Sequence, residues 1–227
     1  MSRKALIIRL LVVVLIVGGV AFTIYYWFFL KMVRVPTGSM MNTIIPGDHI
    51  VVQKSLGQIE RGSIVLFQYP DNPEVANSSG YSPPKGERYL SRVVGLPGET
   101  IQLRGNIIYI NDRPLDEVRV IAQDSGDVDP LIEISTEGSG AYRVFYSEQF
   151  KDPESEAPGN FGTKQPFRIP NDNYFLLGDN RDNSFDSRFR GPVPRELIWG
   201  EASIIYYSEA ETPGSGVRSE RLFKRVQ

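Results

Sequence analysis

The hydrophobic positions of this chain form one long apolar run near the N-terminus and many short alternating runs after it. Residues 10–30, LLVVVLIVGGVAFTIYYWFFL, are uncharged and mostly apolar. A helix rises 1.5 Å per residue, so a helix over this run is about 30 Å long, the hydrocarbon thickness of a bilayer. Aromatic residues close the run at 25–29, as is typical of a membrane interface. The pattern predicts a transmembrane helix.

A cleaved signal peptide and a buried core helix are the alternatives for residues 10–30. The apolar region of a signal peptide is about 7–15 residues long and ends in small residues. This run is longer, and it ends in bulky aromatic residues followed by Lys31 and Arg34. A core helix of this length would show a polar face. An uncleaved anchor is therefore the favoured interpretation.

Basic residues on the two sides of the span favour one orientation. They are Arg3, Lys4 and Arg9 before it, and Lys31 and Arg34 after it. Because basic residues are enriched in cytoplasmic flanks, we expect a single-pass protein of the cell (inner or plasma) membrane. Residues 1–34 would be a cytoplasmic stub with the anchor, and residues 35–227 an extracytoplasmic domain.

Beyond the anchor, short runs rich in β-branched and aromatic residues alternate with turn-forming sequences. The runs lie at 49–54, 63–69, 174–179 and 200–208. Residues 99–115 alternate apolar and polar positions on both sides of Gly105 and Asn106, which predicts a hairpin. We see no amphipathic helix of three turns. The expected fold class is mostly β, an antiparallel β-sheet body behind an N-terminal transmembrane helix.

Three segments of the body lack a strand pattern. Residues 72–87 are polar and rich in Pro, Gly and Ser, which predicts a surface loop. Residues 116–169 are acidic and irregular, and we expect them to form a subsidiary β insertion on the main sheet. The tail, 209–227, is expected to be frayed.

Composition excludes several kinds of chemistry. The chain has no cysteine, so disulfides, thiolate nucleophiles and cysteine-ligated zinc are excluded. A single histidine argues against a histidine-based metal site, and we expect no metal. The net charge is −2, and residues 1–34 carry basic residues only, so the body is acidic. An acidic body argues against a nucleic-acid partner.

A serine nucleophile is the chemistry that remains most open. Ser39 lies in VPTGSMMNTI, just after the apolar run. Serine catalysis requires a base within hydrogen-bonding reach, usually a histidine. His49 is the one histidine, and it also fits an ordinary strand-edge residue. The other base is a lysine whose pKa falls on burial. A carboxylate pair within the acid-rich residues 178–191 is a further option.

Four sequence blocks together resemble type I signal peptidases. They are PTGSMMNTIIPGDHIVVQK (36–54), RGSIVLFQYP (61–70), YLSRVVGLPGE (89–99) and GDNRDNSFDSRFRGPVP (178–194). Type I signal peptidases are membrane-anchored serine endopeptidases that remove signal peptides from exported preproteins. The resemblance covers the anchor and the predicted core strands, and it is weak over 71–87 and 116–169.

The resemblance implies a role for several residues. Ser39 matches the nucleophile of the family. Thr37 would donate its hydroxyl to the oxyanion hole, together with the backbone N–H of Ser39. Ser184 would orient the base, and Asp186 with Arg188 would form a supporting ion pair. From the residues alone, this last block also fits a solvated turn cluster, because Gly-Asp-Asn-Arg favours turns.

The chain departs from the family at the base. The resemblance places the catalytic lysine at the position of Ser91, in YLSRVVGLPG. Arg92 cannot replace it, because a guanidinium stays protonated. Lys85, Lys54 or His49 could act as the base instead. Alternatively, the chain is a natural paralogue with little or no proteolysis, or Ser91 was engineered to give an inactive form.

The resemblance also implies the partners. The substrates would be signal peptides of preproteins, with small residues (Ala-X-Ala) before the cut, and the enzyme would work at the lipid bilayer without a cofactor. The main alternative is a membrane-tethered binding module on the same scaffold, since a fold does not fix a function. A self-cleaving Ser–Lys repressor is disfavoured by the anchor and by the lack of a DNA-binding helical module.

Overall fold

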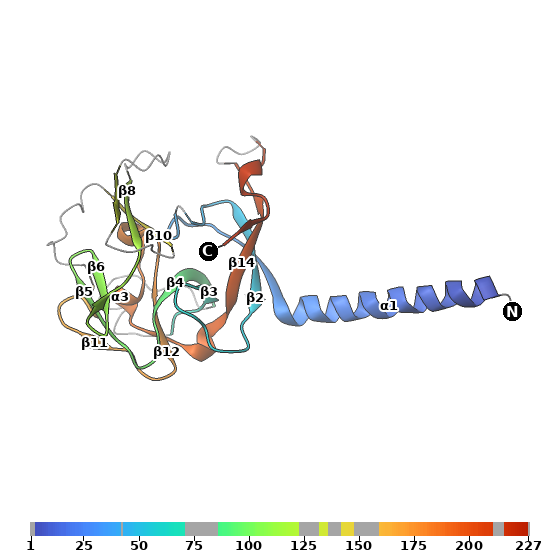
Figure 1. Cartoon of the computed structure of the whole chain (residues 1–227), viewed down its shortest axis with the longest axis horizontal. Helices are drawn as coiled ribbons and strands as arrows, with labels where there is room; N and C mark the ends of the chain where they lie inside the picture. The colour runs from blue at the N-terminus through green and yellow to red at the C-terminus, as the bar shows by residue number, and fades with distance from the viewer. Residues whose placement is uncertain are drawn as a thin grey trace.

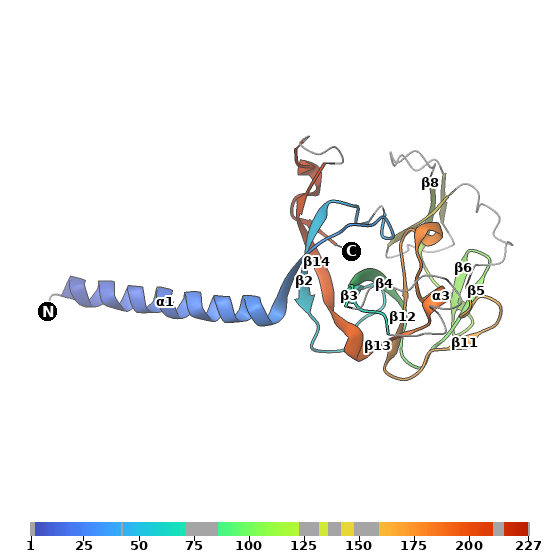
Figure 2. The same ribbon diagram turned by 180° about the vertical axis from the view of Figure 1, so that it is seen from behind.

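A computed structural model shows a long helix that projects from a β-rich body (Figure 1). The described residues are 3–41, 43–70, 86–122, 132–135, 142–147, 159–210 and 216–226. Helix α1 (Arg3–Phe29) carries the N-terminus to its far end, and the C-terminus lies at the body (Figure 2).

Helix α1 can cross a membrane by its length and composition. It has a mean hydropathy of 2.8 over its most apolar window, and none of that window is buried against the body. Within the part of the chain that the structure describes, it is the one such helix. The predicted helix is therefore confirmed, and it is a candidate membrane span.

The main sheet has the strand order β1-β2-β14-β3-β4-β12-β13, with β15 paired to β14. All of its pairings are antiparallel. The strands are β1 (Leu30–Arg34), β2 (Asp48–Lys54), β3 (Ile64–Phe67), β4 (Tyr89–Gly95), β12 (Asn173–Leu177), β13 (Val193–Pro194), β14 (Ile198–Ser208) and β15 (Lys224–Arg225). This sheet contains the end of the body from which α1 projects.

Two smaller sheets complete the described body. One has the order β11-β5-β6-β7 and lies at the end away from α1 (Figure 1). The other has the order β10-β8-β9, in which β10 and β8 are parallel. The strands are β5 (Thr100–Arg104), β6 (Ile107–Ile110), β7 (Arg113–Pro114), β8 (Val118–Ala122), β9 (Ile132–Ser135), β10 (Arg143–Ser147) and β11 (Phe167–Arg168).

The mostly antiparallel β class predicted from the sequence is confirmed. Strands β2, β3, β12 and β14 occupy the predicted runs, and β5 with β6 form the predicted hairpin. Strands β1 and β4 were not among the predicted ones. In the described body the longest helix is α3 (Ser187–Arg190), which agrees with the expected lack of long helices. Most of the loop predicted at 72–87 lies outside the described residues.

The prediction of a frayed tail is wrong for residues 216–226. The tail forms the short helix η4 (Ser219–Arg221) and then β15, which pairs with β14. Arg221 is 9 % exposed and makes an ion pair with Asp48, which is fully buried. Arg221 also donates a hydrogen bond to the carbonyl of Thr43 at 3.0 Å. This paired guanidinium fixes the tail to the segment that follows Ser39.

The hydrophobic core lies on the main sheet and continues under the β5–β6 sheet. One cluster joins Met40, which is 1 % exposed, to the buried side chains of β2 and β3. Burying a side chain of this size is worth about 1.5–3 kcal/mol. Met40 therefore anchors the loop that carries Ser39.

Candidate active site

Ser39 lies in a tight turn between β1 and β2. The N–H of Met41 donates to the carbonyl of Gly38 at 3.0 Å, and the N–H of Ile44 donates to the carbonyl of Met40 at 2.9 Å. The Ser39 side chain is half-buried beside the fully buried Met40. The turn therefore holds the serine hydroxyl near the surface on a backbone that is anchored in the core.

The Ser39 turn is clamped to the segment after β12. The N–H of Asn180 donates to the carbonyl of Ser39 at 3.1 Å, and the Asn180 side-chain amide donates to the carbonyl of Gly38 at 3.0 Å. Two bonds from one residue fix both the position and the angle of the turn. This contact joins residues 142 positions apart in the sequence.

Gly178 brings Ser184 to the same place. A Cβ atom on Gly178 would lie 2.6 Å from the carbonyl oxygen of Ser39 and 2.6 Å from the Cβ of Ser184. Real Cβ contacts are essentially never below 3.0 Å. The absence of a side chain at Gly178 therefore allows Ser39 and Ser184 to approach each other from two different loops.

Ser91 lies on β4 beside the same glycine. In the pairing of β4 with β12, Arg92 is opposite Leu177. Ser91 precedes Arg92 on β4 and Gly178 follows Leu177, so the two positions lie just beyond the end of this pairing. Ser91 is 4 % exposed, and its other neighbour is Val65 of β3. The structure thus brings Ser39 and Ser184 together at Gly178, and Ser91 lies on the strand that pairs with the end of β12 next to this glycine.

A buried ion pair adjoins this serine cluster. Arg92 is 1 % exposed and binds fully buried Asp179 through two bonds, of 2.8 and 2.6 Å. The Thr43 hydroxyl donates to Asp179 at 2.5 Å. Asp179 therefore links the strand of Ser91 to the loop of Ser39. The ring of Tyr142 lies 4.1 Å from the Arg92 guanidinium and covers it.

Asp186 and Arg188 form a second buried pair under the cluster. Arg188 donates to both carboxylate oxygens of Asp186, each at 2.9 Å. Asp186 also caps α3 and accepts the N–H of Gly178 at 3.1 Å. Burial lowers the pKa of the Arg188 guanidinium, but the charge and the hydrogen bonds of Asp186 outweigh burial and raise it overall. These groups are buried, so the block 178–191 is not a solvated turn cluster.

A third pair connects the cluster to the parallel pair of strands. Arg181 donates to Glu117 at 2.7 and 2.8 Å, and it donates to the carbonyl of Gly178 at 3.1 Å. Both side chains are at most 3 % exposed. Burial lowers the pKa of Arg181, but Glu117 more than compensates, so the pKa lies well above the ordinary value. Sequence reasoning did not find this pair, because Glu117 lies in a segment without a strand pattern.

Thr37 is exposed, two residues before Ser39 on the same loop. Among the described residues, its hydroxyl donates to no protein group in the structure. Since no described residue engages it, the Thr37 hydroxyl can donate to a ligand that binds at Ser39.

The candidate bases named from the sequence lie elsewhere or outside the described residues. The Nε2 atom of His49 is 2.9 Å from Glu209, which is also bonded to Arg34. Lys54 ends β2, which begins at Asp48 after the Ser39 turn. The six-residue step from Asp48 to Lys54 along an extended strand is about 20 Å. Lys85 lies outside the described residues. Within the described part of the chain, no lysine amine or histidine nitrogen bonds to the hydroxyl of Ser39.

Metal ligation has no support in the described part of the chain. No group of three or more His, Cys, Asp or Glu side chains is arranged to hold a metal ion among these residues. The acids near Ser39 are instead paired with arginines.

The fold and the site define a β-sheet protein with a candidate membrane span and a serine-centred cluster. The family described as "Signal peptidase, peptidase S26" matches residues 6–207. The chain therefore belongs to this family of serine peptidases, and it is a hydrolase of the signal peptidase I type.

Several curated relatives are similar over most of the chain. Signal peptidase I of Rickettsia typhi is 33 % identical over 201 residues, which cover 77 % of this chain and 70 % of the relative. The Rickettsia akari protein is 34 % identical over 200 residues, with the same two coverages. Signal peptidase I of Aquifex aeolicus is 29 % identical over 209 residues, covering 77 % and 74 %.

A crystal structure of signal peptidase I from Enterococcus faecalis is also similar. It is 24 % identical and covers 65 % of this chain and 98 % of its own, with a TM-score of 0.33.

Proposed function

We propose that this protein removes signal peptides from preproteins by attack of Ser39 on the peptide carbonyl before the cut. Membership in the signal peptidase family supports the reaction. The observation that carries the residue assignment is the convergence of the Ser39 turn, Ser184 and the Ser91 strand at Gly178. The substrate would be an extended segment with small residues before the cut, of the Ala-X-Ala type.

The oxyanion would be stabilised by the loop that carries the nucleophile. In this proposal the N–H of Ser39 and the hydroxyl of Thr37 donate to the negative charge that develops on the carbonyl oxygen. Such a donor is worth about 10²–10³ in rate. The clamp from Asn180 supports this assignment, because it fixes the Ser39 backbone before the substrate binds. A preorganised donor costs no rearrangement in the transition state.

The proton acceptor determines the rate. A serine hydroxyl at position 91 is a poor base, whereas a buried lysine amine loses its proton near neutral pH. A positioned general base contributes about 10²–10⁴ to a rate. We therefore propose that Ser91 makes this chain a slow peptidase unless Lys85 supplies an amine. A non-cleaving binding protein is the outcome that would replace this proposal.

Ser184, Asp186 and Arg188 are assigned to support. Ser184 would orient the base, and the Asp186–Arg188 pair would hold the Gly178 backbone against Ser39. The bond from the Gly178 N–H to Asp186 supports this role.

Orientation in the membrane is part of the proposal. Arg3, Lys4 and Arg9 would remain in the cytoplasm, and the body would lie on the other side. Because the chain has no cysteine, a single cysteine introduced by Lys164→Cys can report the side. We expect a membrane-impermeant maleimide to label this cysteine in intact cells. Labelling only after lysis would contradict the orientation.

The direct test of the function is a cleavage assay. The full chain in detergent is incubated with an Ala-X-Ala preprotein over a range of pH, beside Ser39→Ala and Lys85→Ala variants. We expect a slow cut after the small residue that the Ser39→Ala variant does not make. A loss of activity in the Lys85→Ala variant would identify the base. No product at any pH would overturn the enzyme assignment and favour the binding protein.

A further inference from the structure

A basic pocket lies at the end of the body from which α1 projects. Its volume is about 330 Å³, and it lies between the β1–β2 edge and the start of β14. Lys31, Lys54, Arg88 and Arg195 line it, with the acidic Glu196 and the ring of Trp199. Four basic side chains around one pocket exceed what a single acid can neutralise.

Three of these basic side chains have no ion-pair or hydrogen-bond partner among the residues that the structure describes. Arg195 is used in the fold, because it donates to the carbonyls of Ser55 and Ile198. Among the described residues, no ion pair or hydrogen bond engages Lys31, Lys54 or Arg88. Lys54 and Arg88 are exposed. Their charges are therefore available to a ligand.

Lys31 is held close to the other two cations. Its Nζ lies 4.1 Å from the centre of the Trp199 ring. Burial, and then the positive charges of Arg88 and Lys54, lower the pKa of the Lys31 ammonium. Like charges held together at a surface favour the binding of an anion, which relieves their repulsion.

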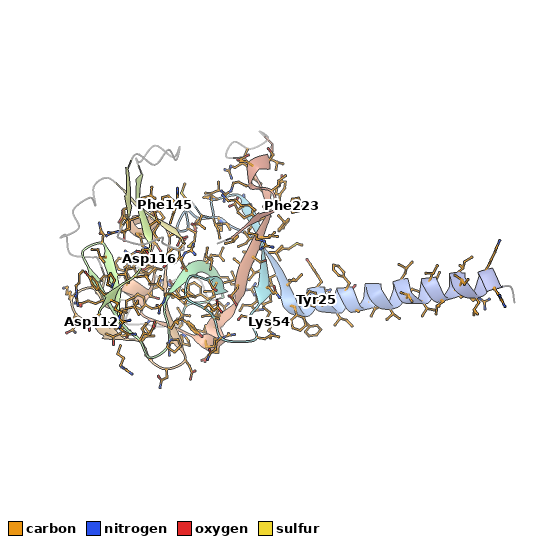
Figure 3. All side chains as sticks on the ribbon, viewed as in Figure 1. Tyr25, Lys54, Asp112, Asp116, Phe145 and Phe223 are labelled. Carbon is orange, nitrogen blue, oxygen red and sulfur yellow. The ribbon has the colours of Figure 1, made fainter. Side chains whose placement is uncertain are left out.

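The pocket lies at the expected level of the membrane surface. Lys31 follows the end of α1, at Phe29, by two residues. In the β1–β2 pairing, Gln53 is opposite Leu30, so Lys54 lies beside the helix end. Figure 3 labels Lys54 at the end of the body from which α1 projects. Leu56, two residues after Lys54, is 75 % exposed and adds an apolar contact at the same end.

We propose that Lys31, Lys54 and Arg88 bind the phosphate of an anionic phospholipid headgroup in this pocket. Phosphate accepts hydrogen bonds from both ammonium and guanidinium donors. Basic groups next to a membrane span attract anionic lipids. The ring of Trp199 packs against the Lys31 ammonium. Tryptophan is enriched at membrane interfaces. The bound lipid would fix the body against the bilayer.

The proposal is independent of the cleavage reaction, because it concerns binding at residues that the proposed reaction does not use. It is tested by fluorescence of Trp199. The chain has two tryptophans, and Trp27→Phe removes the one in the span. This full-length variant in non-ionic detergent is titrated with dihexanoyl phosphatidylglycerol, dihexanoyl phosphatidylcholine or inorganic phosphate. We expect a saturable change with the anionic lipid, and none with the zwitterionic lipid.

Charge variants then test the residues. In the Trp27→Phe background, we expect Lys54→Gln and Arg88→Gln to weaken binding of the anionic lipid roughly fivefold each. Lys54→Arg should retain binding. Lys164 is an exposed lysine just before β11, away from the pocket, so Lys164→Gln should leave binding unchanged. A thermal midpoint equal to that of the parent shows that each variant is folded.

Three results would overturn the proposal. An equal change in Trp199 fluorescence with the anionic and the zwitterionic lipid would show that the negative charge of the headgroup does not contribute to binding. An equal loss of binding in the Lys164→Gln variant would indicate nonspecific attraction. Saturation by inorganic phosphate at the same concentration as the anionic lipid would identify a free-phosphate site instead of a lipid site.

Discussion

The two ends of the body use their charged residues in opposite ways. Around Ser39, the buried Arg92, Arg181 and Arg188 are each paired with a carboxylate. At the end next to α1, Lys54 and Arg88 are exposed and have no ion-pair partner among the described residues. The same residue types therefore stabilise the structure at one end and are available for binding at the other.

This difference separates positioning from recognition. A buried ion pair contributes little net stability, because desolvation offsets its attraction, but breaking it leaves a buried charge. Such pairs fix the loops around Gly178 in one arrangement. An exposed cation is solvated and gains from an external anion. Around Ser39, loss of a single ion-pair partner should therefore lower the stability strongly. At the end next to α1, which we call the membrane end and which carries Lys31, Lys54 and Arg88, lipid binding should depend on salt and on the lipid headgroup.

The largest stability effect is expected from Asp179→Asn. The change leaves the Arg92 guanidinium buried without its counter-charge, which should lower the free energy of unfolding by about 3–5 kcal/mol. Asp112→Asn is the matched control, because the Arg104–Asp112 pair is 50 % and 85 % exposed. It should cost at most about 1 kcal/mol. Denaturant unfolding of the full chain measures both, and equal losses would remove the distinction between buried and exposed ion pairs.

Gly178→Ala should disturb the serine cluster more than the fold. The new Cβ would collide with the Ser39 carbonyl and with Ser184, and overpacking of this kind costs about 1–3 kcal/mol. We expect at least a tenfold loss of cleavage. Gly57→Ala is the control, because its Cβ would meet nothing within 4 Å. Unchanged cleavage in Gly178→Ala would show that the approach of Ser39 to Ser184 does not matter for the reaction.

Salt should act mainly on the membrane end. Raising the ionic strength from 0.01 to 1 M shortens the screening length from about 30 to about 3 Å. We expect the affinity for the anionic lipid to fall severalfold, while the unfolding midpoint changes little because the pairs near Ser39 are buried. Titrations of Trp199 fluorescence and thermal melts at both ionic strengths check this. An unchanged lipid affinity together with a large shift of the unfolding midpoint would contradict the expectation that salt acts mainly next to α1.

The smallest effect on stability is expected from protonation of the Glu209 carboxyl at low pH. Hydrogen bonds from Arg34 and His49 lower the pKa of this carboxyl from 4.5 to about 2. Its contribution to stability is therefore complete above pH 4.5 and is lost as the pH falls towards 2. The Glu209 side chain is 37 % exposed to solvent, so the contribution is small. The difference in thermal midpoint between the wild type and Glu209→Gln should narrow between pH 5 and pH 2.5. A constant difference would contradict this assignment.

Local patterns were sufficient to predict β2, β3, β12 and β14 of the main sheet and the β5–β6 hairpin. Strand β2 alternates buried and less buried residues along its β-branched run. Strand β3 and, after Asn173, strand β12 are continuous apolar runs, and nearly all of their residues are buried. The ordered tail was missed because its stability depends on Arg221 and Asp48, which are 173 residues apart. A charged residue in a polar tail gives no local sign of a buried partner.

The candidate site was predictable only in part. The sequence resemblance named Ser39, Ser184 and the place of Ser91, but it did not indicate the partner of Arg92. That partner, Asp179, is 87 residues away on another strand end. An arginine within an apolar strand such as YLSRVVG is the signal that could have indicated a buried ion pair.

We propose that Ser39 is a peptidase nucleophile and that Ser91 occupies the position of its base. The most direct measurement is the single-turnover rate of preprotein cleavage by Ser91→Lys, compared with the wild type and with the exposed control Ser219→Lys. We predict a rise of about 10²–10⁴ for Ser91→Lys, increasing with pH as the buried amine loses its proton, and no rise for the control. The rise should vanish when Ser39→Ala is added. An unchanged rate in Ser91→Lys would contradict the claim.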